Sequence, residues 1–256
     1  MENSNNKEND ALVTISIVSH GQLKMIHDLL GDLQKLRDSD IEVILTLNND
    51  EELLFDTGSY PFAVTVVKNN RPKGFSENHN SAFAVSKGKY FCVLNPDVRI
   101  LYNPFPTLLE KFKNKKIGLV APKVVNAEGE VEDSMRPFPN PFSILAKALS
   151  FNRHHTKVTE LIDKPYWVAG MIMLFNSKVF KSIGGFDERY FLYYEDVDIC
   201  ARLRLSGCKI VYCPEVSVVH AAQRTSHRNL QYFRWHLTSM VRYFTSKVFF
   251  RTLFSN

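Results

Sequence analysis

The first 95 residues alternate between β-rich apolar runs and segments with helical spacing, and this alternation restricts the fold more than any other feature. Apolar residues recur every three or four positions from Gln22 to Arg37, which predicts a helix, and another helix is expected to start near Ser76. This order of strands and helices predicts an α/β fold with a parallel sheet covered on both faces. The expected strands are Val13 to Ser19, Ile41 to Leu47, Ala63 to Lys68 and Tyr90 to Leu94.

The second half of the chain is less regular. Met135 to Phe142 contains three prolines and is expected to be a loop. Trp167 to Phe175 is apolar and is expected to be one strand, and Glu195 to Leu205 is expected to be a helix that stops before Gly207. Without repeats or a linker, residues 11–222 are expected to form one domain. Further expected elements are a helix at Phe105 to Phe112 and strands at Ile117 to Val125, Lys209 to Tyr212 and Val216 to Val219.

The two ends of the chain differ from this domain in composition. Residues 1–10 are polar and rich in asparagine, and we expect them to be disordered. Residues 223–256 are basic and aromatic, because Glu215 is the last acidic residue and six basic residues follow it. The tail carries +6 and the remainder −1, from the total of +5, which predicts an anionic partner at one end of the molecule. The six residues are Arg224, Arg228, Arg234, Arg242, Lys247 and Arg251.

This tail is expected to be a C-terminal helical appendage, with a helix from Asn229 to Arg251. Aromatic residues and arginines on one side suit the headgroup layer of an anionic membrane, which we expect this helix to contact. The alternative is a helix packed on the domain with a solvated basic rim. A nucleic-acid partner is not expected, because the tail is short and heavily apolar. One side carries Leu230, Phe233, Leu237, Met240, Val241, Phe244 and Val248, and the other carries Tyr232, Trp235, Tyr243 and Phe250 beside Arg228 and Arg242.

Cysteine usage and hydropathy indicate the compartment. The four cysteines have no metal-ligand spacing and form no disulfide framework, so a reducing cytoplasm fits best. No run of about 18 apolar residues is present, and we expect no membrane-spanning segment. The expected location is therefore the cytoplasm.

Asp97 is a candidate metal ligand because it follows Leu94-Asn95-Pro96 at the end of a predicted buried strand. Open α/β sheets bind their ligands at the carboxyl ends of their strands. A carboxylate there can hold Mg²⁺ or Mn²⁺ that keeps water and phosphate oxygens as its other ligands. His220 also ends a predicted strand, and a second ligand there would favour Mn²⁺. The alternative role of Asp97 is that of a turn or helix-cap aspartate.

Asp196 is the candidate general base. It stands between Glu195 and Asp198, and crowding of three carboxylates raises the pKa of at least one of them. One carboxylate that holds a metal–diphosphate and another that removes a proton are the minimum for transferring a sugar from a nucleotide. The alternative is structural, since Asp198 and Arg202 are four apart on one helix face and Glu195 suits a helix N-terminus.

Seven segments together resemble one enzyme family. They are Ile17-Val18-Ser19-His20, Gly74-Phe75-Ser76 with Asn80, Leu94-Asn95-Pro96-Asp97, Trp167-Val168-Ala169-Gly170, Gly184-Gly185-Phe186-Asp187, Tyr194-Glu195-Asp196-Val197-Asp198 with Arg202, and His220. In this order they resemble the family-2 inverting glycosyltransferases, from about Val13 to Tyr243. The resemblance is greatest to bacterial rhamnosyltransferases that extend lipid-linked sugars in O-antigen or related polysaccharide assembly. It implies a GT-A fold, which is a Rossmann-like nucleotide-binding sheet with helices on both faces.

The resemblance also implies a donor site. Ser19, Asn48 and Asn49 would border the nucleobase and ribose, and Asn80 would face the donor from its helix. The DxD-like motif begins with Asn95 and ends with Asp97. Asp97 would hold Mn²⁺ or Mg²⁺, and His220, further along the chain, would be a second ligand of the metal. The implied donor is dTDP-β-L-rhamnose.

On the acceptor side, the resemblance implies that Asp196 is the base and that Glu195 and Trp167 contact the acceptor. The implied acceptor is a saccharide such as GlcNAc on undecaprenyl diphosphate, reached at the inner face of the cytoplasmic membrane. Arg136, in the proline-rich segment, is positioned in sequence to contact a phosphate. A strand tryptophan such as Trp167 is, however, more often part of a core than a sugar platform.

Two departures from the family pattern leave alternatives open. Asn48 stands where an aspartate is common, so base selectivity is expected to differ, and Asn95 leaves the DxD-like motif with a single carboxylate. A UDP-sugar donor, carrying galactofuranose, glucose or GlcNAc, is therefore the first alternative. A non-catalytic carbohydrate-binding relative is the second, although the presence of Asp97, Asp196 and His220 argues against it.

Overall fold

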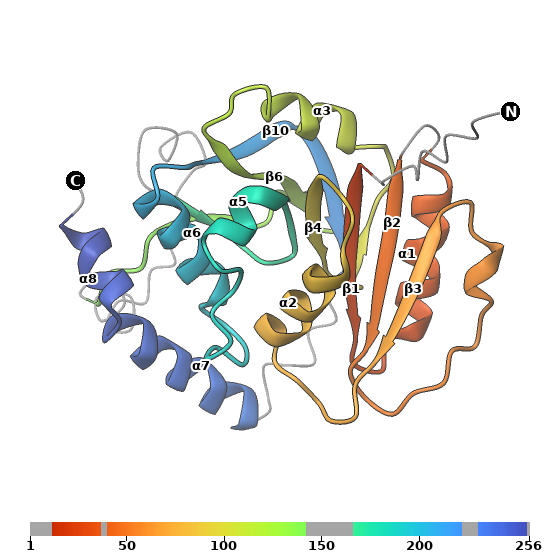
Figure 1. Ribbon diagram of the computed structural model, residues 1–256, viewed down its shortest axis with the longest axis horizontal. Helices are drawn as coiled ribbons and strands as arrows, with labels where there is room; N and C mark the ends of the chain where they lie inside the picture. The colour runs from red at the N-terminus through yellow and green to blue at the C-terminus, as the bar shows by residue number, and fades with distance from the viewer. Residues whose placement is uncertain (1–11, 37–39, 142–165, 222–229, 255–256) are drawn as a thin grey trace, which may run out of the picture.

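The computed structural model describes residues 12–36, 40–141, 166–221 and 230–254, and the disorder predicted for residues 1–10 lies outside them. An 8-stranded sheet forms the centre of the molecule (Figure 1). All four strands expected in the first 95 residues have the predicted bounds. The strands, in spatial order, are β3 (Ala63–Lys68), β2 (Ile41–Leu47), β1 (Val13–Ser19), β4 (Tyr90–Leu94), β9 (Ile172–Asn176), β6 (Ile117–Val125), β10 (Lys209–His220) and β5 (Val98–Arg99).

The parallel sheet predicted from the first 95 residues is confirmed, and the second half of the chain, for which no strand direction was predicted, adds strands of both directions. β3, β2, β1 and β4 are parallel neighbours. β9 enters between β4 and β6 and runs antiparallel to both, and β5 is antiparallel to β10. β10 is parallel to β6. Apolar patterning indicates that a strand is buried on both faces but does not indicate its direction, so the reversal at β9 could not be predicted.

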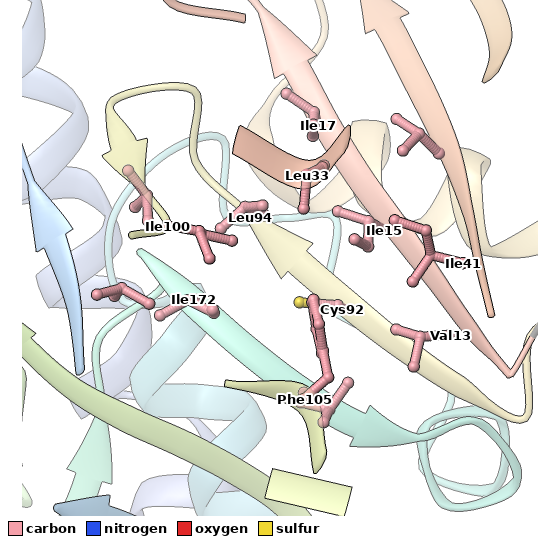
Figure 2. Packing of buried hydrophobic residues seen from close by; sticks show 14 of the residues in the cluster. Val13, Ile15, Ile17, Leu33, Ile41, Cys92, Leu94, Ile100, Phe105 and Ile172 are labelled. Carbon is pink, nitrogen blue, oxygen red and sulfur yellow. The ribbon is translucent and has the colours of Figure 1, made fainter. Parts of the chain in front are cut away.

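Helices cover both faces of the sheet, as predicted. On one face, α1 (Leu23–Gln34) and α3 (Phe105–Lys111) share a core with β1 and β4, where Ile15, Leu33, Cys92 and Phe105 lie close together (Figure 2). On the other face lie α2 (Phe75–Val85), α5 (Ser177–Ser182) and α6 (Glu195–Leu205). Side-chain alternation along β1 separates the two layers, because the Ser16 hydroxyl turns away from Ile15 and lies 2.8 Å from His79 Nδ1 in α2.

Three predicted segments differ in the structure. The proline-rich segment contains a short strand, β7 (Met135–Pro137), which pairs with β8 (Tyr166–Val168) in a 2-stranded ribbon. The prolines stand at or after the end of this strand, where a missing N–H costs no ladder bond. The expected strand at Trp167 to Phe175 is divided into β8 and β9, and the two strands expected before His220 are one strand with an irregular register between Cys213 and Ser217.

The tail forms two helices, α7 (Leu230–Phe244) and α8 (Lys247–Leu253), where one was predicted. The break comes at Ser246, whose hydroxyl accepts the N–H of Phe249 and caps α8. α7 packs on the domain through its aromatic side: the Trp235 ring lies 4.6 Å from the Phe191 ring, and Tyr243 is buried. Among the described residues, no helix has the length and hydropathy needed to cross a membrane.

The exposed side of α7 is therefore the side that carries mainly aliphatic residues together with Phe233. Leu230, Phe233, Leu237 and Val241 are 76%, 63%, 43% and 53% exposed and form one stripe along the helix. The sequence interpretation that turned the aromatic residues toward a membrane is wrong for Trp235, because its ring packs on the domain. We call these four residues the outer stripe.

Candidate active site

The carboxyl ends of the parallel strands meet along one edge of the sheet. β1, β2 and β4 share a direction, so Ser19, Asn48 and Asp97 all follow strands that end at this edge. β10 has the same direction, because β9 reverses the chain between β4 and β6, and it delivers His220 to the same edge. The fold thus brings residues from both ends of the domain to the edge where open sheets bind ligands.

His220 joins Asp97 to a third residue, Glu132. His220 Nε2 lies 3.2 Å from Asp97 Oδ2, and Nδ1 lies 2.7 Å from Glu132 Oε2. The Glu132 backbone is fixed after β6, since its N–H donates to the Val124 carbonyl at 2.9 Å. Hydrogen bonding to Asp97, and then to Glu132, raises the pKa of His220 to about 8.

Asp97 and His220 have the chemistry to hold a divalent cation. Asp97 Oδ1 is buried and has no hydrogen-bond partner among the described residues, so one carboxylate oxygen is left to accept a ligand. A carboxylate oxygen and an imidazole nitrogen suit Mn²⁺. The described part of the chain holds no group of three or more His, Cys, Asp or Glu placed to bind a metal. The pair therefore fits a cation that completes its coordination with phosphate oxygens and water.

Asp196 lies at the N-terminus of α6, beside the same edge of the sheet. Its Oδ1 accepts the N–H of Val197 at 2.9 Å, and its Oδ2 accepts the N–H of Gly170 at 3.2 Å. The next residue, Met171, accepts the N–H of Asn95 at 2.9 Å, which ties the carboxylate to the end of β4. Burial raises the pKa of Asp196 to about 6, although the two backbone N–H groups oppose the shift.

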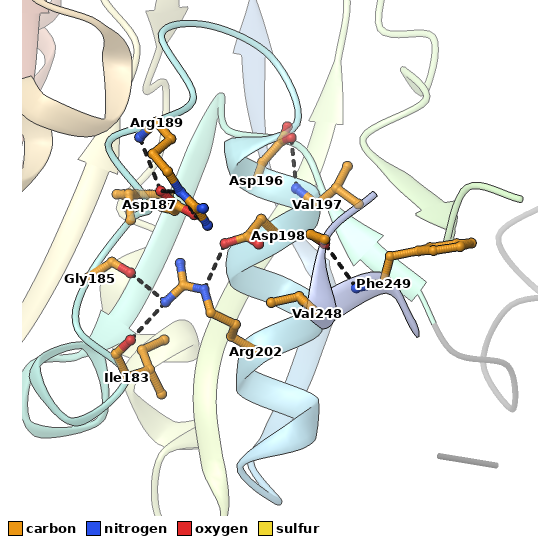
Figure 3. Close-up of polar contacts among 12 residues, drawn as sticks. Ile183, Gly185, Asp187, Arg189, Asp196, Val197, Asp198, Arg202, Val248 and Phe249 are labelled. Carbon is orange, nitrogen blue, oxygen red and sulfur yellow. Dashed lines mark hydrogen bonds and ion pairs between the residues drawn. The ribbon is translucent and has the colours of Figure 1, made fainter. Parts of the chain in front are cut away.

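The two acidic neighbours of Asp196 have different surroundings, and Figure 3 shows those of Asp198 beside Arg202. Asp198 accepts a 2.7 Å hydrogen bond from Arg202, which also donates to carbonyls of the Ile183–Gly185 turn. Asp198 is therefore structural, as the alternative interpretation held. Glu195 is buried, and burial together with the adjacent Asp196 raises its pKa well above the usual range. Its predicted contact with the acceptor stays a prediction.

The segment before α6 is strained and held in place by α2. Tyr193 and Tyr194 have φ angles of 70° and 66°, in the left-handed region that side chains rarely adopt, at a cost of roughly 1–3 kcal/mol each. The Phe191 carbonyl accepts the N–H of Phe75 at 2.8 Å. A Cβ at Gly74 would lie 2.6 Å from that carbonyl oxygen, so only glycine permits this close approach.

Asp196 lines a pocket of about 190 Å³, which we call the base pocket. Trp167 contributes one wall but is only 9% exposed, and its indole N–H donates to the Pro137 carbonyl at 3.1 Å. The Arg136 guanidinium lies over the Trp167 ring, 5.3 Å from its centre, so the cation already occupies one face. Stacking of a sugar on Trp167 stays a prediction that concerns the other face. The remaining lining residues are Pro139, Ala169, Tyr193, Tyr194, Val197 and His236.

The predicted donor residues lie at the sheet edge in two environments. Asn48 is buried, and its amide both donates to and accepts from the Lys73 backbone, at 2.9 and 2.8 Å. The Ser19 hydroxyl donates to Glu51 at 2.8 Å. Asn49 is exposed. Asn48 thus fixes the loop after β3, and its predicted contact with the nucleobase stays a prediction.

Asn80 is engaged away from the sheet edge. Its side chain donates to the Phe186 carbonyl and accepts the Phe186 N–H, both at 2.9 Å, and also donates to Glu188 at 3.0 Å. These contacts tie α2 to the turn after α5. Its predicted contact with the donor is untested, and the geometry gives Asn80 a positioning role.

Two residues of the site were missed in the sequence. Glu132 lies in an acidic turn with Glu128 and Glu130, and nothing in that pattern distinguishes it. His236 from α7 lines the base pocket and packs edge-on against the Tyr193 ring, 5.3 Å between ring centres. It lies on the same side of α7 as Tyr243, seven residues later, but the burial of Tyr243 is known only from the structure, so the sequence held no signal for His236.

Comparison with known proteins adds a family and several relatives. A family model described as "Glycosyltransferase like family 2" matches residues 11–238. Rhamnosyltransferase WbbL of Escherichia coli (strain K12) is 31% identical over 258 residues, which cover 92% of this chain and 94% of that protein. N-acetylglucosaminyl-diphospho-decaprenol L-rhamnosyltransferase of Mycobacterium tuberculosis is 30% identical over 148 residues, 54% of this chain and 48% of that protein. The match to the mycobacterial relative thus spans about half of its length.

Solved structures show the fold. A mannosyltransferase, PcManGT from Pyrobaculum calidifontis in complex with GDP-Man and Mn²⁺, superposes with a TM-score of 0.63 at 17% identity, over 90% of this chain and 64% of that one. GalNAc-T7 with UDP, GalNAc and Mn²⁺ has a TM-score of 0.65 at 18% identity, over 93% of this chain and 48% of that one. The predicted GT-A fold is confirmed.

Proposed function

The chain belongs to the family-2 glycosyltransferases and resembles the bacterial rhamnosyltransferases, and on that premise we propose its substrates. We propose that it transfers L-rhamnose, with inversion, from dTDP-β-L-rhamnose to a saccharide such as GlcNAc on undecaprenyl diphosphate. The E. coli relative, a rhamnosyltransferase aligned along almost its whole length, supports the sugar. The mycobacterial relative, whose name specifies a diphospho-decaprenol acceptor, supports the lipid diphosphate.

The observation that carries this proposal is the placement of Asp196 in a pocket beside the edge that holds Asp97 and His220. Inversion by direct displacement needs a base that removes the acceptor hydroxyl proton as the new bond forms. Burial raises the pKa of the Asp196 carboxyl, and two backbone N–H groups hold the carboxylate in place. The carboxylate is therefore suited to take that proton. Asp198 is excluded from this role by its ion pair with Arg202.

Asp97 and His220 would hold the metal of the donor, Mn²⁺ or Mg²⁺. When bound, such a cation stabilises the negative charge that develops on the departing diphosphate. The GT-A neighbours solved with Mn²⁺ support a divalent metal. Glu132 orients the His220 ring through Nδ1 and thereby directs Nε2 toward Asp97.

The outer stripe of α7 would contact the membrane that carries the acceptor. Four exposed apolar side chains follow one line of this helix, and no acidic residue occurs after Glu215. An apolar face next to basic residues is what binds a helix to the surface of an anionic bilayer. We place the enzyme at the inner face of the cytoplasmic membrane, where α7 would set the base pocket beside the lipid headgroups.

Asp196→Asn tests the proposed chemistry, because asparagine keeps the shape of the side chain but does not act as a base. Transfer from dTDP-rhamnose to a lipid-diphosphate GlcNAc should fall by about 10²–10⁴-fold, with dTDP affinity unchanged. Asp28→Asn, on the exposed surface of α1, is the matched control and should keep full activity. An unchanged transfer rate in Asp196→Asn would exclude this residue as the base.

Calorimetric titration with dTDP and with UDP, each with and without Mn²⁺, tests the donor. Tight dTDP binding that the metal enhances supports a rhamnosyl donor and the role of Asp97. A preference for UDP would assign a uridine-linked sugar instead. Binding of neither nucleotide would favour a carbohydrate-binding relative without turnover.

A further inference from the structure

The acceptor proposed above would bring negative charge into the base pocket, close to the Asp196 carboxylate. The inference drawn from this charge rests on the proposed function. A saccharide on a lipid diphosphate carries negative charge next to its first sugar. Bringing that charge near Asp196 disfavours the ionised carboxylate, which is the form that accepts a proton. A pocket that admits this acceptor therefore needs a cation.

Arg136 is the sole cationic side chain among the described residues that line the base pocket. The other titratable base there is His236, and burial lowers the pKa of its imidazole, so it is neutral at pH 7. Arg136 is close enough to Asp196 for its charge to oppose the rise in the carboxyl pKa. The same guanidinium is therefore within electrostatic reach of a charged group on a bound acceptor.

The fold holds Arg136 in place without burying it. β7 and β8 pair Arg136 directly with Trp167, and the guanidinium lies over the tryptophan ring. Nε donates to the Asp133 carbonyl at 2.9 Å and lies 3.0 Å from the Asp133 carboxylate. Its side chain is 46% exposed. Contacts at Nε and at one face of the guanidinium orient the group. Nε carries only one of the five N–H donors of the guanidinium.

We propose that Arg136 binds the phosphate attached to the acceptor sugar and makes this enzyme selective for diphosphate-bearing acceptors over neutral glycosides. The sugar would then span the base pocket, with its reacting hydroxyl at Asp196 and its anomeric phosphate at Arg136. Guanidinium is suited to this task because it binds phosphate oxygens through two parallel N–H groups. The sequence position of Arg136 had suggested a contact with a phosphate, and this assignment identifies that phosphate as the one on the acceptor.

The test compares two acceptors: a short-chain alkyl-diphospho-GlcNAc and the corresponding alkyl GlcNAc glycoside without phosphate. Arg136→Gln should lower kcat/KM for the diphosphate acceptor by about 10- to 100-fold, because it removes a charge-assisted hydrogen bond, and by less than about threefold for the neutral acceptor. Arg136→Lys should fall between, since it keeps the charge but not the fork. Assays at pH 8 keep Asp196 ionised in every variant.

Two controls separate this role from others. Arg204→Gln removes another guanidinium stacked on an aromatic ring, Phe138, outside the base pocket, and should affect both acceptors equally and weakly. Affinity for dTDP with Mn²⁺ should be unchanged in Arg136→Gln.

Three outcomes would overturn the assignment. An equal loss on both acceptors would make Arg136 structural, and weakened dTDP binding would return it to the donor. Full activity of Arg136→Gln on the diphosphate acceptor would remove it from the site while leaving the proposed function intact. Failure of the wild type on both acceptors would instead contradict the proposed function itself.

Discussion

The metal side and the acceptor side of this site are built in different ways. Asp97 follows β4 and His220 ends β10, two strands of the central sheet, and a 3.2 Å contact joins the two side chains. Asp196 lies in the first turn of α6, directly after a strained segment, Arg136 lies in a short ribbon, and His236 of α7 lines the same pocket. The two strand ends would fix the proposed metal site through the sheet itself. The acceptor side depends on contacts between separate segments, so it is the side on which related enzymes can change specificity at low cost to the fold.

This difference predicts that substitutions on the two sides separate cleanly. Changes on the metal side should weaken nucleotide binding that depends on metal. Changes on the acceptor side should alter transfer and leave nucleotide binding as it is. The following predictions test this separation, and an acceptor-side variant that weakens nucleotide binding would break it.

Asp97→Asn should have the largest effect. Loss of the carboxylate removes the anionic ligand of the proposed cation, and several kcal/mol of transition-state stabilisation with it, so transfer should fall by about 10³-fold. Calorimetry should show that Mn²⁺ no longer enhances dTDP binding, while dTDP alone still binds. Metal enhancement that persists in this variant would place the cation elsewhere.

Glu132→Ala should have the next largest effect, although Glu132 does not contact the proposed metal. Without the 2.7 Å contact to Nδ1, the imidazole of His220 is free to rotate or change tautomer, and Mn²⁺ affinity measured with dTDP should fall by about 10- to 100-fold. Glu132→Gln, which still accepts a hydrogen bond, should lose less.

Glu130→Ala is the matched control for Glu132, because it lies in the same turn and binds Asn126 instead. It should leave Mn²⁺ affinity unchanged. Equal losses in Glu130→Ala and Glu132→Ala would show that the turn, and not the contact with His220, supports the metal site.

The sequence predicted the metal side better than the acceptor side for a physical reason. β4 is continuous, apolar and buried, so its end is visible in the sequence and pointed to Asp97 just after it, while His220 was identified as the end of a shorter predicted strand. The helix at Glu195–Leu205 was also found at its observed bounds. A left-handed φ at Tyr193, or the meeting of Gly74 with Phe191, follows from contacts between distant segments and leaves no local pattern.

Other elements were missed although a signal was present. Ser246 is a good helix N-cap and marks the break between α7 and α8, but the apolar spacing continues across it. The orientation of α7 was assigned from the preference of aromatic residues for membrane interfaces. In the structure, Trp235 finds an aromatic partner on the domain, and this tertiary contact determines the orientation of the helix.

The pH dependence of transfer gives a third, smaller effect on the acceptor side. A base works when deprotonated, so at saturating Mn²⁺, which would keep the His220 ligand deprotonated, kcat/KM should be constant above about pH 6 and fall tenfold per pH unit below it, because burial raises the pKa of Asp196 to about 6. Arg136→Gln should move this limb to higher pH, since the Arg136 charge favours the carboxylate. An acid limb near pH 4 would indicate that the base is a solvated carboxylate. A limb that does not move in Arg136→Gln would show that the Arg136 charge does not affect the pKa of Asp196.

The smallest expected effect concerns the outer stripe, outside both sides of the site. Leu237 is already partly covered in the free protein, so Leu237→Ser should weaken binding to vesicles containing anionic phosphatidylglycerol by only about threefold to tenfold. Thr238→Ser, the neighbouring position, should bind as the wild type does. Because the stripe faces away from Tyr243 and the domain core, thermal stability and dTDP affinity should be unchanged in both variants.

Reduced transfer to a lipid-anchored acceptor, with normal transfer to a short-chain one, would show that the membrane presents the acceptor to the base pocket. Equal vesicle binding by Leu237→Ser and Thr238→Ser would contradict membrane binding by the outer stripe and would favour a protein partner for it.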